Sequence, residues 1–235
     1  MSAAEHLIVG NRVLSTLAKT RYRSLWAGLE RVMLEAERVL YAPGDAVTHV
    51  YFPIDSVVSM LCKVDDDRTV EVAMLGNESV VGQIIYLGGA HSYQLSVVRD
   101  TGNAMQLDIE FLASCVKESD PLRDLLNKSA HALVNQIVQS SVCNRFHSVN
   151  SRVARWLLMT HDRIASRTFL ATQESIARLL GVRRSSVTAA ASGLQLQRIV
   201  DYRRGRIEIL DERKLQAACC SCYGVIKRQY DSFLQ

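Results

Sequence analysis

The sequence predicts an α+β protein in which a region of antiparallel strands precedes one long helix and then a smaller unit of short helices and a β-hairpin. Three observations support this order. Apolar and polar residues alternate between residues 38 and 107, apolar residues follow helical spacing from 121 to 142, and Lys and Arg concentrate after 149. We therefore expect a β domain over 1–120, a helix and hinge over 121–146, and a second domain over 147–235.

In the β domain, residues 10–35 have helical spacing and predict a helical entry. Short strands follow, separated by turn signals such as Ala42-Pro43-Gly44-Asp45, Gly76-Asn77 and Thr101-Gly102-Asn103. This regular spacing is typical of an antiparallel sandwich or barrel. Residues 79–98 hold no Asp, Glu, Lys or Arg, but their glycines, glutamines and His91 are too many for a membrane span. We expect buried strands and a loop there.

The long helix begins near Pro121. Its apolar residues, from Leu122 to Val142, form a band wider than a single seam, so the helix has two surfaces to bury. One surface is expected to face the β domain and the other a second copy of the chain. The alternative is a helix packed only within its own chain.

Residues 172–194 predict two helices joined by a tight turn. Thr172 is a suitable N-cap, and Gly181 permits the left-handed backbone of the turn. With Ala177 and Val187 this is the helix-turn-helix pattern, which places its second helix in the DNA major groove. The exposed face of that helix carries Arg183, Arg184, Ser185, Ser186 and Thr188. The alternative is a solvated helical hairpin with a basic rim.

Residues 199–210 predict a hairpin that turns at Gly205, which makes the unit a winged helix-turn-helix. Arg203, Arg204 and Arg206 lie at its tip, where arginines suit the DNA backbone.

Charge is divided unevenly along the chain. Residues 1–149 carry a net charge of −4 and residues 150–235 a net charge of +8. A basic domain on an acidic body predicts a polyanionic partner, double-stranded DNA, for that domain only. No export signal is visible, and the six cysteines show no disulfide framework. We expect a cytoplasmic protein.

This order of parts resembles the Crp/Fnr superfamily of bacterial transcription regulators. The resemblance lies in Leu40-Tyr-Ala-Pro-Gly-Asp45, His49-Val-Tyr-Phe-Pro53, Thr69-Val-Glu-Val-Ala-Met-Leu-Gly76, Cys143-Asn-Arg-Phe-His-Ser-Val149, Arg155-Trp-Leu-Leu-Met-Thr-His-Asp162 and Leu180-Gly-Val-Arg-Arg-Ser-Ser-Val187. It implies a jelly-roll barrel like the cyclic-nucleotide-binding domain, a homodimer on a two-fold operator, and RNA polymerase as a partner. It also implies that Arg184 and Ser185 read base edges and that Ser186 meets phosphate. Ala189 stands where several relatives hold a second arginine.

The effector region departs from the cyclic-nucleotide binders of that superfamily. Their Gly-Glu pair corresponds to Gly82-Gln83, and no arginine occurs between Arg68 and Arg99 to pair with a cyclic phosphate. An unpaired buried phosphate costs several kcal/mol, so cyclic AMP is disfavoured. Tyr86, His91 and Tyr93 lie in the matching loop and are candidates for a pocket whose effector is unknown. The alternative is that they fill the barrel.

The sequence gives little support for metal binding or catalysis. The histidines show no His-x-His or His-x-x-x-His pair, and Cys219-Cys220-Ser221-Cys222 supplies one Cys-x-x-Cys, fewer ligands than a zinc or iron–sulfur site needs. We therefore predict no metal, no cofactor and no enzyme. Two rivals remain: a ligand-binding regulatory protein whose basic domain contacts protein, and a metal-dependent barrel enzyme.

Overall fold

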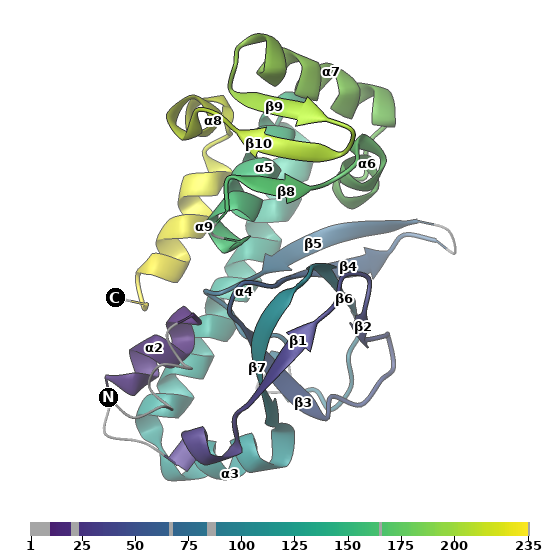
Figure 1. Ribbon diagram of the computed structural model, residues 1–235. Coiled ribbons are helices and arrows are strands. Elements are labelled where there is room, and N and C mark those ends of the chain that lie inside the picture. Colours follow the sequence, from purple (N-terminus) through teal and green to yellow (C-terminus); the bar gives the residue numbers. More distant parts are fainter. Residues whose placement is uncertain (1–9, 20–23, 66–67, 84–87, 165, 235) are drawn as a thin grey trace.

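The computed structural model describes residues 10–19, 24–65, 68–83, 88–164 and 166–234. Figure 1 shows the β domain in the lower part, the long helix α4 beside it, and the C-terminal domain above. The strands of the β domain are β1 (Glu30–Leu34), β2 (Val39–Tyr41), β3 (His49–Pro53), β4 (Val57–Lys63), β5 (Thr69–Leu75), β6 (Leu95–Asp100) and β7 (Gly102–Asp108). They form two antiparallel sheets, ordered β1-β7-β3 and β2-β6-β4-β5.

The predicted antiparallel sandwich or barrel is confirmed as a fold, without a barrel closed by hydrogen bonds among the described residues. Outside the named strands, single bridges join Tyr51 to Val81 and Ala46 to His91. The side chains of Leu34, Val58 and Val98 are fully buried within this domain. The two sheets thus enclose one apolar core instead of a channel.

The helical entry is shorter than its spacing indicates. Helix α2 covers Arg12–Ala18 and a 3₁₀ turn covers Ser24–Gly28, but β1 already begins at Glu30. Pairing with β7, in which Val32 lies opposite Ala104, overrides the local helical pattern of residues 30–34. The prediction of helix over the whole of 10–35 is therefore wrong at its C-terminal end.

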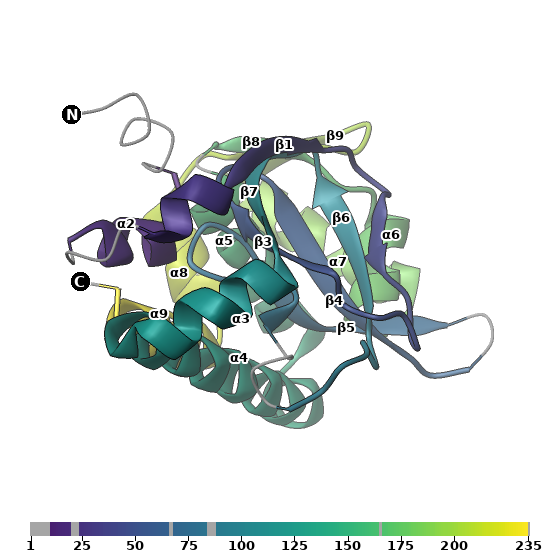
Figure 2. The ribbon, with the colours of Figure 1, turned by 90° about the horizontal axis from the view of Figure 1, so that it is seen from below.

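Helix α3 (Ile109–Glu118) leads into α4 (Asp120–Phe146), which Ser119 caps by accepting the N–H of Leu122 at 3.3 Å. Leu122, Leu126 and Leu133 are buried on the inner side of α4. Helix α9 (Cys222–Asp231) lies alongside α4, as Figures 1 and 2 show. The last helix of the chain thus packs against the long helix.

The C-terminal domain consists of α5 (Val149–Ile164), β8 (Thr168–Leu170), α6 (Gln173–Leu180), α7 (Arg184–Leu196), β9 (Val200–Arg203), β10 (Arg206–Ile209), α8 (Glu212–Ala218) and α9. Helix α5 lies between the sheets and the helices above it. The indole of Trp156 donates to Glu71 Oε1 at 3.1 Å, and Arg163 pairs with Glu78 at 2.7 Å. No helix in the described part of the chain is long and apolar enough to cross a membrane.

Candidate nucleic-acid interface

Helix α6 and its turn have the local structure that the sequence predicts. Thr172 Oγ1 accepts the N–H of Ser175 at 3.0 Å, and Ile176 and Ala177 are buried. Gly181 ends the helix with φ +62°, and the N–H of Val182 returns to the carbonyl of Ala177 at 3.0 Å. This left-handed cap satisfies the last carbonyls of α6 and turns the chain toward α7.

Helix α7 presents one buried and one exposed face. Val187, Ala190, Ala191 and Leu194 are buried beneath it. Arg183, Arg184, Ser185 and Thr188 are exposed and Ser186 is half-buried. No side chain caps the N-terminus of α7, so its first N–H groups remain available to an anion such as a DNA phosphate.

Two residues of α6 contact this exposed face. Glu174 Oε2 lies 3.8 Å from Arg184 Nε, and Thr188 Oγ1 donates to Gln173 Oε1 at 2.6 Å. Gln173 and Glu174 were not among the residues predicted from the sequence. Their position directly after the cap Thr172 is the signal that could have found them, because the first turn of α6 faces the start of α7.

The β9–β10 hairpin has a two-residue turn. Arg204 and Gly205 both have positive φ, 51° and 79°, which matches the twist of a tight hairpin. The N–H of Ala171 donates to the carbonyl of Gly205 at 2.8 Å, which ties the hairpin to the start of α6. Arg203 Nε lies 3.1 Å from Asp201 Oδ1. Strand β8 completes the sheet β8-β10-β9.

Tyr202 joins the hairpin to the helices. Its hydroxyl donates to the carbonyl of Ala171 at 2.7 Å. Burial raises the pKa of Tyr202, although the nearby Arg184 opposes the shift. The phenol therefore remains a neutral donor at physiological pH and holds α6 against the hairpin.

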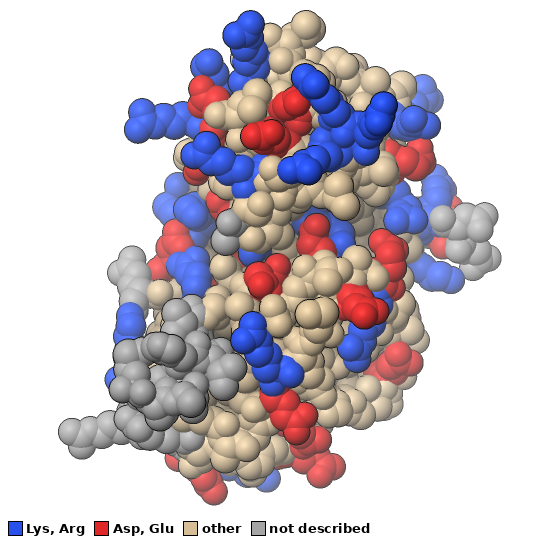
Figure 3. Space-filling view, in the orientation of Figure 1, with Lys and Arg blue, Asp and Glu red and all other residues tan. Residues whose placement is uncertain are grey.

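All nine residues predicted to contact DNA lie on this helix-turn-helix and its hairpin. Lys and Arg gather over this upper part of the face shown in Figure 3. Thr172 and Arg204, together with Arg178, also border a cleft of about 740 Å³ between this domain and the β sheets. Val97 and Arg99 of β6 form part of its opposite wall, and Trp156 of α5 also lines it.

The predicted effector residues are only partly brought together. Gly82, with φ +87°, and Gln83, 1% exposed, border a cavity of about 20 Å³, room for roughly one water molecule. Ser129 donates to Gln83 Oε1 at 2.7 Å. His91 is exposed and Tyr93 is 77% exposed, so neither lines this cavity. Tyr86 lies outside the described residues.

The cysteine pattern also differs from its interpretation in the sequence. In the sequence, Cys219 and Cys222 form one Cys-x-x-Cys pair, but in the structure Cys220 and Cys222 lie beside Cys143 and His147 from the end of α4. The Cys-x₃-His pair at the end of α4 is the signal that was missed.

Comparisons with known proteins agree with this geometry. Residues 151–218 match the family of the Crp-like helix-turn-helix domain. The fold resembles FixK2 from Bradyrhizobium japonicum, with a TM-score of 0.70, 15% identity, and coverage of 82% of this chain and 98% of that one. It also resembles the c-di-GMP-responsive global regulator CLP from Xanthomonas campestris, with a TM-score of 0.65, 16% identity, and coverage of 83% and 98%.

A third solved structure, a transcriptional regulator of the CRP family from Thermus thermophilus, has a TM-score of 0.66, 15% identity, and coverage of 80% and 95%. A search of curated proteins by sequence finds no match. At these identities the structural likeness establishes the fold, and the domain match identifies the helix-turn-helix.

Proposed function

We propose that this chain, which carries a Crp-like helix-turn-helix domain and has the fold of the Crp/Fnr regulators, is a homodimeric, sequence-specific transcription regulator that binds a palindromic operator without cyclic AMP. The observation that carries the proposal is the exposed N-terminal half of α7, with Arg183, Arg184 and Ser185, beside an arginine-rich hairpin. The protein acts in the cytoplasm as a regulator and not as an enzyme, with RNA polymerase as its further partner.

In this proposal α7 enters the major groove. Arg184 pairs with guanine O6 and N7, because its guanidinium is exposed at the start of the helix. Glu174 holds that guanidinium at 3.8 Å until the base edge replaces it. Arg183, Ser186 and the hairpin arginines contact phosphates, which adds affinity without sequence information.

The exposed side of α4 supports the homodimer. Val134, Val138 and Val142 recur every fourth residue and are 42%, 56% and 41% exposed. Residues at this spacing form one continuous apolar stripe along a helix. A second copy of α4 would cover the stripe, and a palindromic operator would then require the two recognition helices to lie about 34 Å apart, one turn of DNA.

Two features support independence from cyclic AMP. Among the described residues that line the small cavity beside Gly82 and Gln83 there is no Lys or Arg to pair with a phosphate. Its volume of about 20 Å³ is also far below that of a nucleotide. An effector, if the protein uses one, acts elsewhere or after a rearrangement of this core.

The DNA test is an in-vitro selection from random duplex DNA with the full chain, at one near-physiological salt concentration and without a nucleotide. We expect a palindrome whose half-sites lie about 10 base pairs apart, centre to centre. Failure of a folded, dimeric protein to enrich any sequence would contradict DNA recognition and favour a protein partner for the basic domain.

The dimer test compares two equal substitutions at exposed valines. Val138→Asp places a charge in the α4 stripe, whereas Val64→Asp changes a valine of similar exposure, 60%, after β4. Sedimentation should show that only Val138→Asp dissociates the dimer and loses tight operator binding. Equal behaviour of the two variants would argue against the stripe as the dimer surface.

A further inference from the structure

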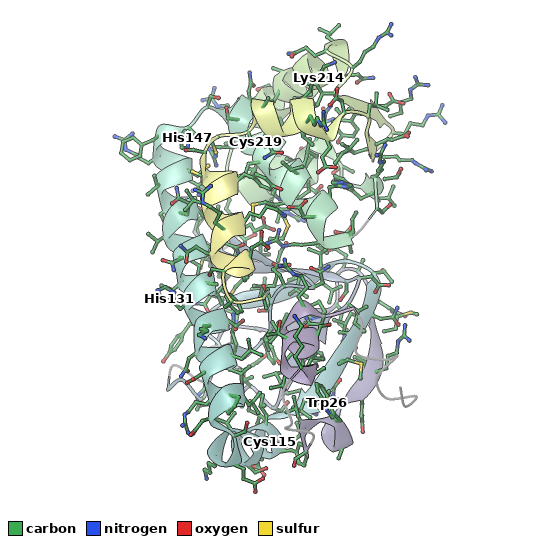
Figure 4. The ribbon with its side chains drawn as sticks, turned by 90° about the vertical axis from the view of Figure 1, so that its left-hand side faces the viewer. Trp26, Cys115, His131, His147, Lys214 and Cys219 are labelled. Atoms are coloured by element: carbon green, nitrogen blue, oxygen red, sulfur yellow. The ribbon has the colours of Figure 1, made fainter. Side chains whose placement is uncertain are left out.

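Four side chains with metal-binding atoms meet where the long helix ends. Cys143 and His147 lie one turn apart at the end of α4, Cys220 comes from the turn between α8 and α9, and Cys222 begins α9. Their ligand atoms all lie within 4.8 Å of one another. Figure 4 shows His147 at the end of α4, level with the turn that carries Cys219.

The distances between these ligand atoms fit tetrahedral coordination of one metal ion. Cys143 Sγ lies 3.4 Å from Cys220 Sγ, and Cys222 Sγ lies 3.4 Å from His147 Nδ1. Zinc bonds of about 2.3 Å to sulfur and 2.0 Å to nitrogen imply tetrahedral edges of about 3.8 Å between two sulfurs and about 3.5 Å between sulfur and nitrogen. We propose that these residues form a Cys₃His site that holds one zinc ion and clamps the end of α4 to the C-terminal helices.

The surroundings of the cluster suit an anionic complex. Three thiolates and one Zn²⁺ together carry a charge of −1. Arg152, only 6% exposed, has no carboxylate partner among the described ion pairs, and Cys143 and Cys220 are near enough to interact with it electrostatically. Removing a lone guanidinium from water is costly, so an anionic metal complex beside Arg152 would compensate its charge.

The cluster also has an outer hydrogen bond of the kind found at metal sites. Gln139 Nε2 donates to Cys222 Sγ at 3.0 Å, and such partners orient ligands and tune their affinity. Cys143 and Cys222 are fully buried, while Cys220 and His147 are half-buried. A buried, complete set of four ligands is typical of structural zinc.

The position of the site indicates what the ion does. His147 is the C-cap of α4, and α5 begins two residues later at Val149, so the ion spans the break between the two helices. Arg152, on the first turn of α5, donates to the carbonyl of Leu180 at the end of α6. Zinc would thus fix the path from the long helix to the helix-turn-helix. An effect on DNA binding rests on the proposed function.

The test measures metal on the full chain, purified under reducing conditions without chelator. Mass spectrometry should find about one zinc per chain, and cobalt replacement should give the visible absorption of a tetrahedral thiolate site. Cys143→Ser and Cys222→Ser should each lose the ion. Cys219→Ser should keep it, because Cys219 Sγ instead donates to the carbonyl of Leu215 at 3.2 Å.

Two further variants distinguish loss of the metal site from misfolding of the protein. His147→Cys should retain zinc, because it restores a fourth ligand, and Gln139→Ala should weaken zinc affinity about 10- to 100-fold in a folded protein. Hydrogen exchange should rise after chelation at 143–149 and 219–223, ahead of the rest of the chain.

Several outcomes would overturn the zinc site. They are a reduced chain that takes up neither zinc nor cobalt, metal retained by both Cys143→Ser and Cys222→Ser, iron with sulfide in place of zinc, or a native Cys143–Cys220 disulfide in the peptide map. Because none of these measurements involves DNA, failure of the metal site and failure of the proposed regulator are distinguishable.

Discussion

Two groups of arginines in the C-terminal domain differ in what surrounds them. Arg183, Arg184, Arg203, Arg204 and Arg206 lie on the exposed surface of the helix-turn-helix and its hairpin. Arg152, Arg155 and Arg163, all on α5, are 5–6% exposed. Both groups contribute to the net charge of +8, but only the first is placed to meet a polyanion. Net charge alone therefore overstates the positive charge that this domain exposes at its surface.

Within the buried group, Arg163 joins the two domains. Arg163 pairs with Glu78 at 2.7 Å and donates to Gln136 Oε1 at 3.3 Å, so it links α5 to the β domain and to α4. Arg99, at the opposite wall of the cleft, lies 4.5 Å over the ring of Trp156. These contacts connect α5 to the β domain and to α4.

The largest expected effect comes from breaking the buried pair. Arg163→Met removes the cation and leaves the carboxylate of Glu78 buried without its partner, which should lower the free energy of unfolding by about 3–5 kcal/mol. Urea unfolding measures the loss. The ratio of operator to random-DNA affinity should be unchanged at temperatures where the variant is folded.

The double variant Arg163→Met with Glu78→Leu separates charge from packing. It should recover part of the lost stability, because no lone charge then stays buried. If the double variant is no more stable than Arg163→Met alone, the loss of stability arises from packing. The buried arginines would then differ from the exposed ones in packing and not in the pairing of their charge.

The exposed group should show the reverse pattern. Arg184→Ala should leave unfolding nearly unchanged but weaken operator binding by about 1–3 kcal/mol for each half-site and relax the preference at one base pair. Arg213→Ala, an exposed arginine on α8, controls for charge. An equal loss on every sequence would show that Arg184 contacts the backbone and not a base.

Most of the fold was accessible from the sequence because its signals are local. The cap at Thr172, the glycine at 181 and the alternation around Gly205 each specify their own structure, and all three agree with the structure. The burial of Arg163 was not accessible, since its partner Glu78 and its neighbour Gln136 come from other parts of the chain.

The cluster of Cys143, His147, Cys220 and Cys222 was not predicted from the sequence for the same reason. Cys143 and Cys220 are 77 residues apart, and no local pattern places α9 beside α4. The strand β1 was misjudged because its partner β7 lies some 70 residues away. In the effector region, the sequence identified Gly82 and Gln83 beside the cavity, but gave no sign that Tyr93 points to solvent.

Thr172 tests the boundary between the two groups, because it both caps α6 and belongs to the predicted DNA face. Thr172→Ala removes the acceptor of the Ser175 N–H and should cost about 1 kcal/mol of stability, whereas Thr172→Ser should cost little. Thermal unfolding measures the stability that is lost with the N-cap hydrogen bond. A loss of DNA affinity in Thr172→Ala, measured below its unfolding transition and rescued in Thr172→Ser, would assign the hydroxyl a phosphate contact as well.

The smallest expected effect is at the hairpin tip, where the dependence of the loss on DNA sequence and salt is more informative than its size. Arg204→Ala should weaken binding to operator and random DNA alike, by a few-fold, and reduce the slope of log affinity against log salt by about 1 for each half-site, because one fewer phosphate is neutralised. Titrations at four salt concentrations measure this slope. Arg204 has a positive φ, 51°, so Arg204→Asn, which tolerates that backbone, is the matched variant that removes the charge without straining the turn. If Arg204→Asn instead changes the ratio of operator to random-DNA affinity and leaves the slope of log affinity against log salt unchanged, the hairpin contacts base edges in a groove and contributes to sequence specificity.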